Sequence, residues 1–154
     1  MEKSILKDLQ AYPILDLTKS NYGFYNKFDL YISRIISSGK NAICILDYIY
    51  PLKKLSSNIY QISDHVNLSG FNPLIGPQFI QLNNIYLTKS KLPKIIVAGL
   101  KEGTIPTKKE GKVLLKSKVN AYCYNLIPAV ILAASKGLKV YALGLVASSN
   151  QYLT

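Results

Sequence analysis

The sequence is poor in the residues that bind metals and read nucleic-acid bases. It has one His, two Cys and eight carboxylates in 154 residues, and none of them stand at the spacing of a metal site. Arg34 is the single arginine among 19 basic residues, and arginine makes most bidentate contacts to bases and phosphates. We therefore expect no metal and no specific nucleic-acid partner, despite a formal net charge of +11.

Long apolar runs are also absent. The longest, LIPAVILAA at residues 126–134, falls short of the roughly 20 residues that a membrane-spanning helix needs. Residues 1–12 alternate charged and apolar side chains, which predicts no secretory signal. Cys44 and Cys123 each lie among apolar neighbours, which predicts buried free thiols and a reducing compartment. A soluble, cytoplasmic protein without a membrane partner is expected.

The apolar residues present are typical of a single globular domain over residues 1–154. Runs rich in Ile and Val predict buried strands at residues 41–46, 59–63, 94–99 and 139–146. Helical patterns fall at residues 28–39, 107–118 and 125–137. Thr107 and Glu110 have capping-box spacing, and Asn125 is a candidate N-cap. This alternation predicts an α/β fold, with a mainly parallel or mixed twisted sheet flanked by helices.

Residues 61–79, QISDHVNLSGFNPLIGPQF, resemble the rim of a ligand site. In parallel sheets ligands bind beyond the carboxyl ends of the strands, which favours the loops after Leu46, Ser63, Gly99 and Val146. His65 follows Asp64, but adjacent residues of an extended segment point to opposite sides. From these residues alone we favour a structural imidazole, bonded to backbone, over an acid–base pair.

The same segment carries a resemblance to a known family. ISDHVNLSGFNPLIGP, residues 62–77, closely resembles the block ISDHINLTGQNPLIGP of the trimeric purine nucleoside phosphorylases. Residues 23–35, 97–114 and 119–150 are similar to further family blocks, so the resemblance covers roughly residues 20–150 and leaves residues 1–20 as a divergent segment. It implies the phosphorylase fold, a homotrimer and phosphate-dependent cleavage of purine nucleosides without a metal or cofactor.

The resemblance also implies that working residues are replaced. The Arg-Phe-His phosphate motif of the family falls on Leu17–Thr18–Lys19, and its TNAAGG turn falls on residues 46–51, LDYIYP. The N-terminal phosphate loop and the ribose-contacting His of the family have no counterpart, which suggests a truncated, degenerate member. The positions equivalent to its base pocket are Glu102, Gly103, Tyr124, Asn125, Ser148 and Asn150, and the retained loop positions are Asp64, His65, Asn67 and Asn72.

Three functions follow as hypotheses. The first is a catalytically inactive structural or regulatory subunit, in a homo-oligomer (a trimer by resemblance) or in a hetero-assembly with another protein. The second is a reduced phosphorylase or hydrolase that still binds a purine nucleoside in a rebuilt pocket, with phosphate needed only if activity remains. The third is a basic surface module for RNA or another anionic partner, formed by the lysines of residues 101–118, which are otherwise the solvent face of a helix.

Overall fold

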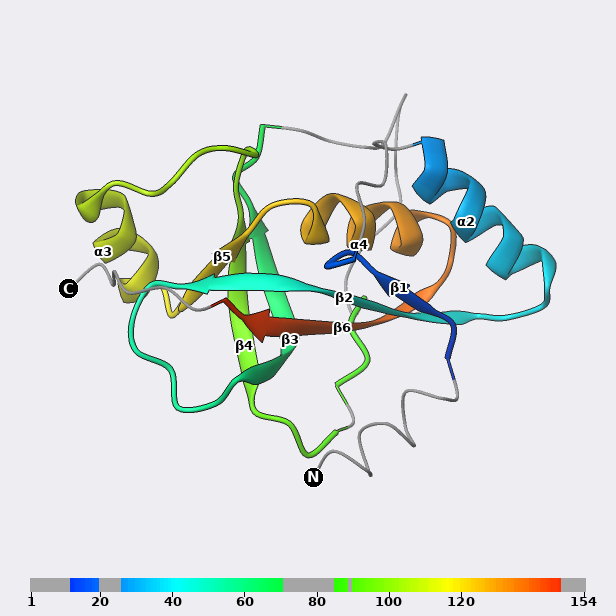
Figure 1. Cartoon of the computed structure of the whole chain (residues 1–154), viewed down its shortest axis with the longest axis horizontal. Helices are drawn as coiled ribbons and strands as arrows, with labels where there is room; N and C mark the ends of the chain where they lie inside the picture. The colour runs from blue at the N-terminus through cyan, green and yellow to red at the C-terminus, as the bar shows by residue number, and fades with distance from the viewer. Residues whose placement is uncertain (1–11, 20–25, 71–84, 89, 148–154) are drawn as a thin grey trace.

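The computed structural model describes residues 12–19, 26–70, 85–88 and 90–147. Within these ranges the chain forms six strands and three helices (Figure 1). In chain order they are β1 (Ile14–Asp16), α2 (Asn26–Ser37), β2 (Ala42–Pro51), β3 (Ile59–Asn67), β4 (Lys94–Gly99), α3 (Lys108–Lys116), β5 (Ala121–Cys123), α4 (Leu126–Ser135) and β6 (Lys139–Val146). No helix in these ranges is both long and apolar enough to cross a membrane.

The strands close into a barrel-like sheet. β2 pairs in parallel with β6, β6 antiparallel with β3, and β3 and β5 each pair in parallel with β4. The ring closes where Tyr50 and Pro51 of β2 pair with Tyr122 and Ala121 of β5, and β1 adds to β2 in parallel. The predicted α/β class and mixed strand directions are confirmed, but the predicted twisted sheet is in fact a closed, barrel-like sheet, because the short strand β5 joins its two sides.

Strand direction also corrects the predicted functional edge. β3, β4 and β5 run opposite to β1, β2 and β6. The loop after Gly99 therefore leaves the barrel at the other end from the loop after Val146.

The predicted strands and helices all form, but their limits differ. β3 continues through Asn67, so the whole ISDHVN segment, residues 62–67, belongs to a strand rather than to a loop. The register with β4 shifts between Ile62 and Asp64, which indicates a β-bulge. Beyond this bulge the polar residues Asp64, His65 and Asn67 continue to pair with β4. β1 and β5 were not predicted, since three residues are too few for a periodic pattern.

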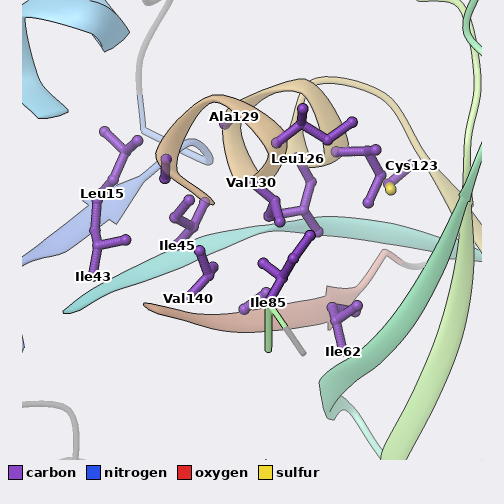
Figure 2. Packing of buried hydrophobic residues seen from close by; sticks show 14 of the residues in the cluster. Leu15, Ile43, Ile45, Ile62, Ile85, Cys123, Leu126, Ala129, Val130 and Val140 are labelled. Carbon is purple, nitrogen blue, oxygen red and sulfur yellow. The ribbon is translucent and has the colours of Figure 1, made fainter. Parts of the chain in front are cut away.

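The main core lies between the barrel and α4. Leu126 and Val130 of α4 point toward Ile45 and Val140 of the barrel (Figure 2). α2 packs on α4, and its Tyr31 Oη donates a hydrogen bond to the carbonyl of Ile14 at 2.8 Å. Cys44 and Cys123 are buried free thiols, as predicted.

The helix ends follow the sequence signals in part. The capping box of α3 is confirmed, with Thr107 Oγ1 accepting from the Glu110 N–H at 3.1 Å and Glu110 Oε1 accepting from the Thr107 N–H at 3.2 Å. Gly137 follows α4 with a φ of +89°, a conformation that favours glycine. Asn125 precedes α4 but has helical backbone angles and makes no side-chain capping bond, so its predicted capping role is wrong.

Candidate functional site

The retained motif residues serve the fold around β3. His65 Nδ1 lies 2.6 Å from Tyr86 Oη, so the ring bonds a side chain rather than the predicted backbone group. Burial lowers the pKa of His65, and the charge of exposed Asp64 only partly opposes this. Asn67 Oδ1 accepts hydrogen bonds from the N–H and hydroxyl of Ser69, which forms a local turn. Asn72 lies outside the described residues.

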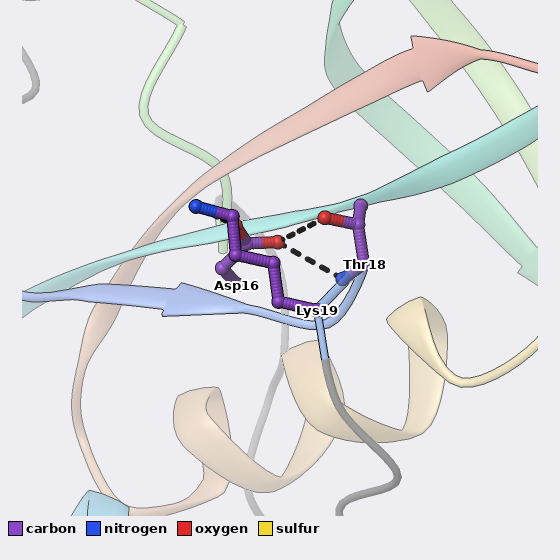
Figure 3. A network of polar contacts seen from close by, with 3 residues as sticks. All are labelled: Asp16, Thr18 and Lys19. Atoms are coloured by element: carbon purple, nitrogen blue, oxygen red, sulfur yellow. Dashed lines mark hydrogen bonds and ion pairs between the residues drawn. The ribbon is translucent and has the colours of Figure 1, made fainter.

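A first group of polar contacts stands just after β1, where the resemblance aligns the phosphate motif of the family. The N–H and the Oγ1 of Thr18 both donate to Asp16 Oδ1, at 2.9 and 2.5 Å (Figure 3). Lys19 Nζ lies 3.9 Å from Asp16 Oδ2 and is largely exposed, so this ion pair is weak. The donors of this segment are therefore directed to a carboxylate of the chain itself.

A second carboxylate stands on the neighbouring strand β2, in the segment aligned with the TNAAGG turn. Asp47 Oδ1 accepts a hydrogen bond from the N–H of Tyr48 at 2.7 Å. Burial raises the pKa of Asp47 to about 6; the Tyr48 N–H lowers it and the charge of Asp16 adds to the rise. Asp16 pairs in register with Leu46, the residue before Asp47, so the two carboxyl side chains leave opposite faces of the sheet. The charge of Asp16 is accordingly the smallest of the three effects on the pKa of Asp47. We call Asp16 and Asp47 the carboxylate pair.

Three aromatic rings gather where β2 meets β5. The centroids of Tyr50 and Tyr122 are 5.3 Å apart in a stacked arrangement, and Tyr124 lies 5.5 Å from Tyr50 and 6.0 Å from Tyr122. We call these three residues the tyrosine cluster. Burial raises the pKa of Tyr124 to about 12, with smaller effects from the neighbouring groups. The three hydroxyls are therefore neutral donors at physiological pH.

The tyrosine cluster is tied to the loop after β4. Tyr124 Oη donates to the carbonyl of Thr104 at 2.6 Å, and Thr104 bonds back to the Lys101 carbonyl through its N–H and Oγ1. Glu102 and Gly103 lie within this turn and are exposed, with Gly103 at a φ of +84°. The structure thus places Glu102, Gly103, Tyr124 and half-buried Asn125 at one side of the barrel, while Ser148 and Asn150 lie outside the described residues.

Three residues of this region were not among those singled out from the sequence: Asp16, Asp47 and Tyr122. Asp47 stands in the aligned turn at residues 46–51, where the alignment indicates Tyr48, Ile49 and Tyr50 as bulky replacements, and this turn was the available signal for it. Asp16 and Tyr122 lie on β1 and β5, the two strands that were not predicted. Within the described residues, no group of three or more His, Cys, Asp or Glu side chains is arranged to hold a metal ion.

Comparison with solved structures gives consistent neighbours. The chain superposes on Schistosoma mansoni purine nucleoside phosphorylase bound to a monocyclic inhibitor with a TM-score of 0.71 and 21% identity, covering 89% of this chain and 62% of that one. Schistosoma enzymes with hypoxanthine and with guanosine give TM-scores of 0.68 and 0.67 at 21% and 20% identity, each covering 82% of this chain. The chain has a purine nucleoside phosphorylase-like fold.

The likeness concerns the fold, since identity is near one residue in five. The chain spans 54% of the hypoxanthine-bound neighbour and 59% of the guanosine-bound one. No protein-family model matches the sequence, and no curated protein sequence matches it either. Within the phosphorylase-like fold, the carboxylate pair and the tyrosine cluster are therefore the features of this chain that bear on function.

Proposed function

We propose that this protein is a phosphorylase-fold subunit without phosphorolytic activity, with a structural or regulatory role in an oligomer or in a complex with another protein. The observation that carries the proposal is the use of the donors just after β1 and within β2. Both donors of Thr18 and the N–H of Tyr48 bind Asp16 and Asp47. These donors lie in the two segments that align with phosphate-holding segments of the family.

Electrostatics argues against phosphate at this position. A phosphate anion needs cationic side chains or free N–H and O–H donors, whereas the carboxylate pair adds negative charge and takes the donors already there. The side chain of Tyr50 also stands where the aligned turn has glycine. Loss of one stabilising donor costs about 10²–10³ in rate, so the loss of several should leave negligible phosphorolysis.

The remaining parts of the proposal rest on what the chain retains. The buried core and the packing around β3 maintain the scaffold without contributing chemistry, which suits a subunit that acts through its surface. In this proposal the subunit needs no cofactor, and a homotrimer or a hetero-assembly is its setting. Buried thiols at Cys44 and Cys123 suit a reducing compartment such as the cytoplasm.

The test is a phosphorolysis assay on inosine and guanosine, with product bases separated by chromatography and a Schistosoma mansoni phosphorylase measured alongside. We expect a rate at least about 10⁴-fold below that enzyme, from two or more lost donors. The variant carrying Asp16→Asn and Asp47→Asn should bind phosphate more tightly than the wild type, by isothermal titration. Enzyme-like turnover by the wild type would end the proposal.

A second candidate function, nucleoside binding in a rebuilt pocket, is favoured by the tyrosine cluster. Stacked aromatic rings hold purine bases, and Glu102 and Asn125 lie on the adjoining segments. A thermal-shift screen with inosine, guanosine, adenosine, hypoxanthine and guanine, with and without phosphate, tests it through ligand linkage. Tyr124→Ala should abolish any shift, whereas Tyr48→Ala, outside the cluster, should preserve it; no shift for any purine would remove this candidate.

A further inference from the structure

A groove separate from the carboxylate pair opens beside α3. It has a volume of about 570 Å³ and is lined by the end of β3, the loop after β4 and one face of α3. In Figure 1 this helix stands at one end of the molecule, well away from α2 and α4. The apolar part of the lining is formed by Leu68, Leu100, Ile105, Pro106, Val113 and Leu114.

Several apolar side chains of the groove are strongly exposed. Ile105 is 73% exposed, Val113 60% and Leu68 52%. Isolated exposed apolar residues are common on protein surfaces, but apolar residues that converge on one hollow mark an interaction site. These three come from three different segments and line the same groove, so the patch is formed by the fold and not by one run of sequence.

Positive charge lies along the border of the groove, and Lys101 is part of its lining. Residues 101–118 contain six lysines and two glutamates, and all six lysines are exposed. Lys109 and Lys116 lie four residues before and three residues after Val113, which places them beside it on the helix surface. Glu110 also lines the groove, but its carboxylate is engaged at the start of α3 by the N–H of Thr107.

We propose that this groove binds an acidic amphipathic segment of a partner protein, with its apolar side chains on Ile105 and Val113 and its carboxylates toward Lys109 and Lys116. Helices commonly dock in this way, with apolar residues at i, i+3, i+4 and i+7 in a groove. Complementary charge along the border orients the partner and speeds association. The proposal concerns a different surface from the carboxylate pair and does not depend on the loss of phosphorolysis.

Charge and chemistry disfavour the other occupants. A second copy of this chain would bring a formal net charge of +11 against a lysine-rich border, so like charges would oppose the contact. Nucleic acid would use the lysines but would leave the aliphatic side chains of Leu68, Ile105 and Val113 without a role, because bases stack on aromatic rings or on arginine. An acidic segment with apolar side chains uses both features.

The test uses a fluorescein-labelled peptide of about 16 residues, with leucines at helical i, i+3, i+4 and i+7 spacing and glutamates elsewhere. Binding to the full chain is followed by fluorescence anisotropy. Two control peptides have the same composition in scrambled order, and the same leucines with lysines in place of glutamates. The protein variants are Val113→Glu for the groove, Lys109→Glu with Lys116→Glu for the border, and Lys40→Glu as an exposed lysine after α2.

We expect the acidic peptide, but neither control peptide, to bind with micromolar affinity. This affinity should fall about tenfold or more when the salt concentration rises well above physiological strength. Val113→Glu and the double lysine variant should each weaken binding at least about tenfold, whereas Lys40→Glu should change it less than about twofold. Circular dichroism and urea unfolding verify that Val113→Glu folds, as its exposed position allows.

Four outcomes would overturn the proposal. They are no binding of the acidic peptide, equal binding of the scrambled peptide, dimerisation of the wild type that Val113→Glu abolishes, and binding of an RNA oligonucleotide that depends on Lys109 and Lys116 but not on Val113. A protein that bound the peptide and also phosphorolysed inosine would contradict the proposed function and leave this inference standing.

Discussion

The helices α4 and α3 belong to the same chain but are opposite in character. α4 is apolar on every side, and its residues from Leu126 to Ala133 are all buried. α3 buries only Gly111 and Leu114, and carries lysines and the exposed Val113 on the rest of its surface. α4 lies over the barrel beneath α2, whereas α3 contributes Leu114 to a small separate cluster with Leu52, Ala98 and Val119.

This difference suits the two helices to different roles, α4 to the stability of the fold and α3 to interaction with other molecules. A helix buried on all sides contributes through packing, and almost any polar change in it disturbs the core. A short helix attached by a few side chains is stabilised mainly by its cap and can vary its surface freely. We therefore expect mutations in α4 to affect folding and mutations in α3 to affect recognition.

The largest expected difference in stability comes from truncating one aliphatic side chain on each helix to alanine. Ile127→Ala leaves a cavity beneath α4 and should lower the free energy of unfolding by about 2–5 kcal/mol. Val113→Ala removes a side chain that is 60% exposed and should lower it by less than about 0.5 kcal/mol. Urea unfolding followed by circular dichroism measures both; equal losses would erase the contrast between the helices.

Gly99 of β4 tests how tightly α4 packs on the barrel, because it faces Ile127 of that helix. A Cβ at this position would lie 2.9 Å from Ile127 Cβ and Cγ1, so Gly99→Ala should destabilise the protein by about 1–3 kcal/mol. Combining it with Ile127→Ala should cost less than the sum of the two single changes, because alanine lacks Cγ1 and Cγ2, two of the three Ile127 atoms nearest the added methyl group. A double-mutant cycle measures this coupling, and strict additivity would show that α4 moves freely away from Gly99.

The fold could be predicted from sequence wherever an element was long and periodic. The Ile- and Val-rich runs of β2, β4 and β6 and the patterns of all three helices are strong local signals. Closure of the barrel was out of reach because it depends on β5, whose three residues carry no periodicity. The end of β3 was missed because a bulge, which is a property of two paired strands, interrupts its pattern at Ser63.

The candidate site was predictable only in outline. The sequence indicated the segments of Thr18, Tyr48 and Tyr124 through aligned motifs, and the structure brings Tyr124 against the loop of Glu102. It could not indicate that Asp16 and Asp47 stand on neighbouring strands, because that depends on the pairing of β1 with β2, a contact between segments about 30 residues apart. The hydrogen bonds that the two carboxylates accept are local, from residues one or two positions away.

Asp47 allows a pH-dependent test of stability near the core that α4 covers. Burial and then the charge of Asp47 raise the pKa of Cys123, a buried residue of that core. The folded pKa of Asp47, about 6, is above the ordinary value of 3.8. The stability from its protonated form is full below about pH 4 and is lost as the pH rises through about 6. Asp47→Asn should therefore stabilise the protein at neutral pH by about 1–2 kcal/mol, allowing for its partial exposure.

The measurement is the free energy of unfolding of the wild type and of Asp47→Asn between about pH 4 and pH 7.5. The difference between the two proteins, rather than either curve, isolates this carboxyl from the other titrating groups. The gain should shrink steadily toward low pH. A constant difference across the range would mean that Asp47 titrates normally and that the carboxylate pair is well solvated.

The smallest expected loss of stability comes from a change at the cap of α3. This change affects that helix without touching the rest of the fold. Thr107→Ala removes the acceptor for the Glu110 N–H and should cost about 1 kcal/mol, whereas Thr107→Ser preserves the oxygen and should cost much less. Because α3 is attached by few side chains, the loss should appear as faster amide hydrogen exchange within Lys108–Lys116 while exchange in α4 is unchanged. Thr107→Ala should also weaken binding of the acidic peptide, since Val113 and its flanking lysines are positioned only while the helix is formed. Faster exchange throughout α4 as well would mean that the two helices unfold as one unit, and the division between a packing helix and a recognition helix would fail.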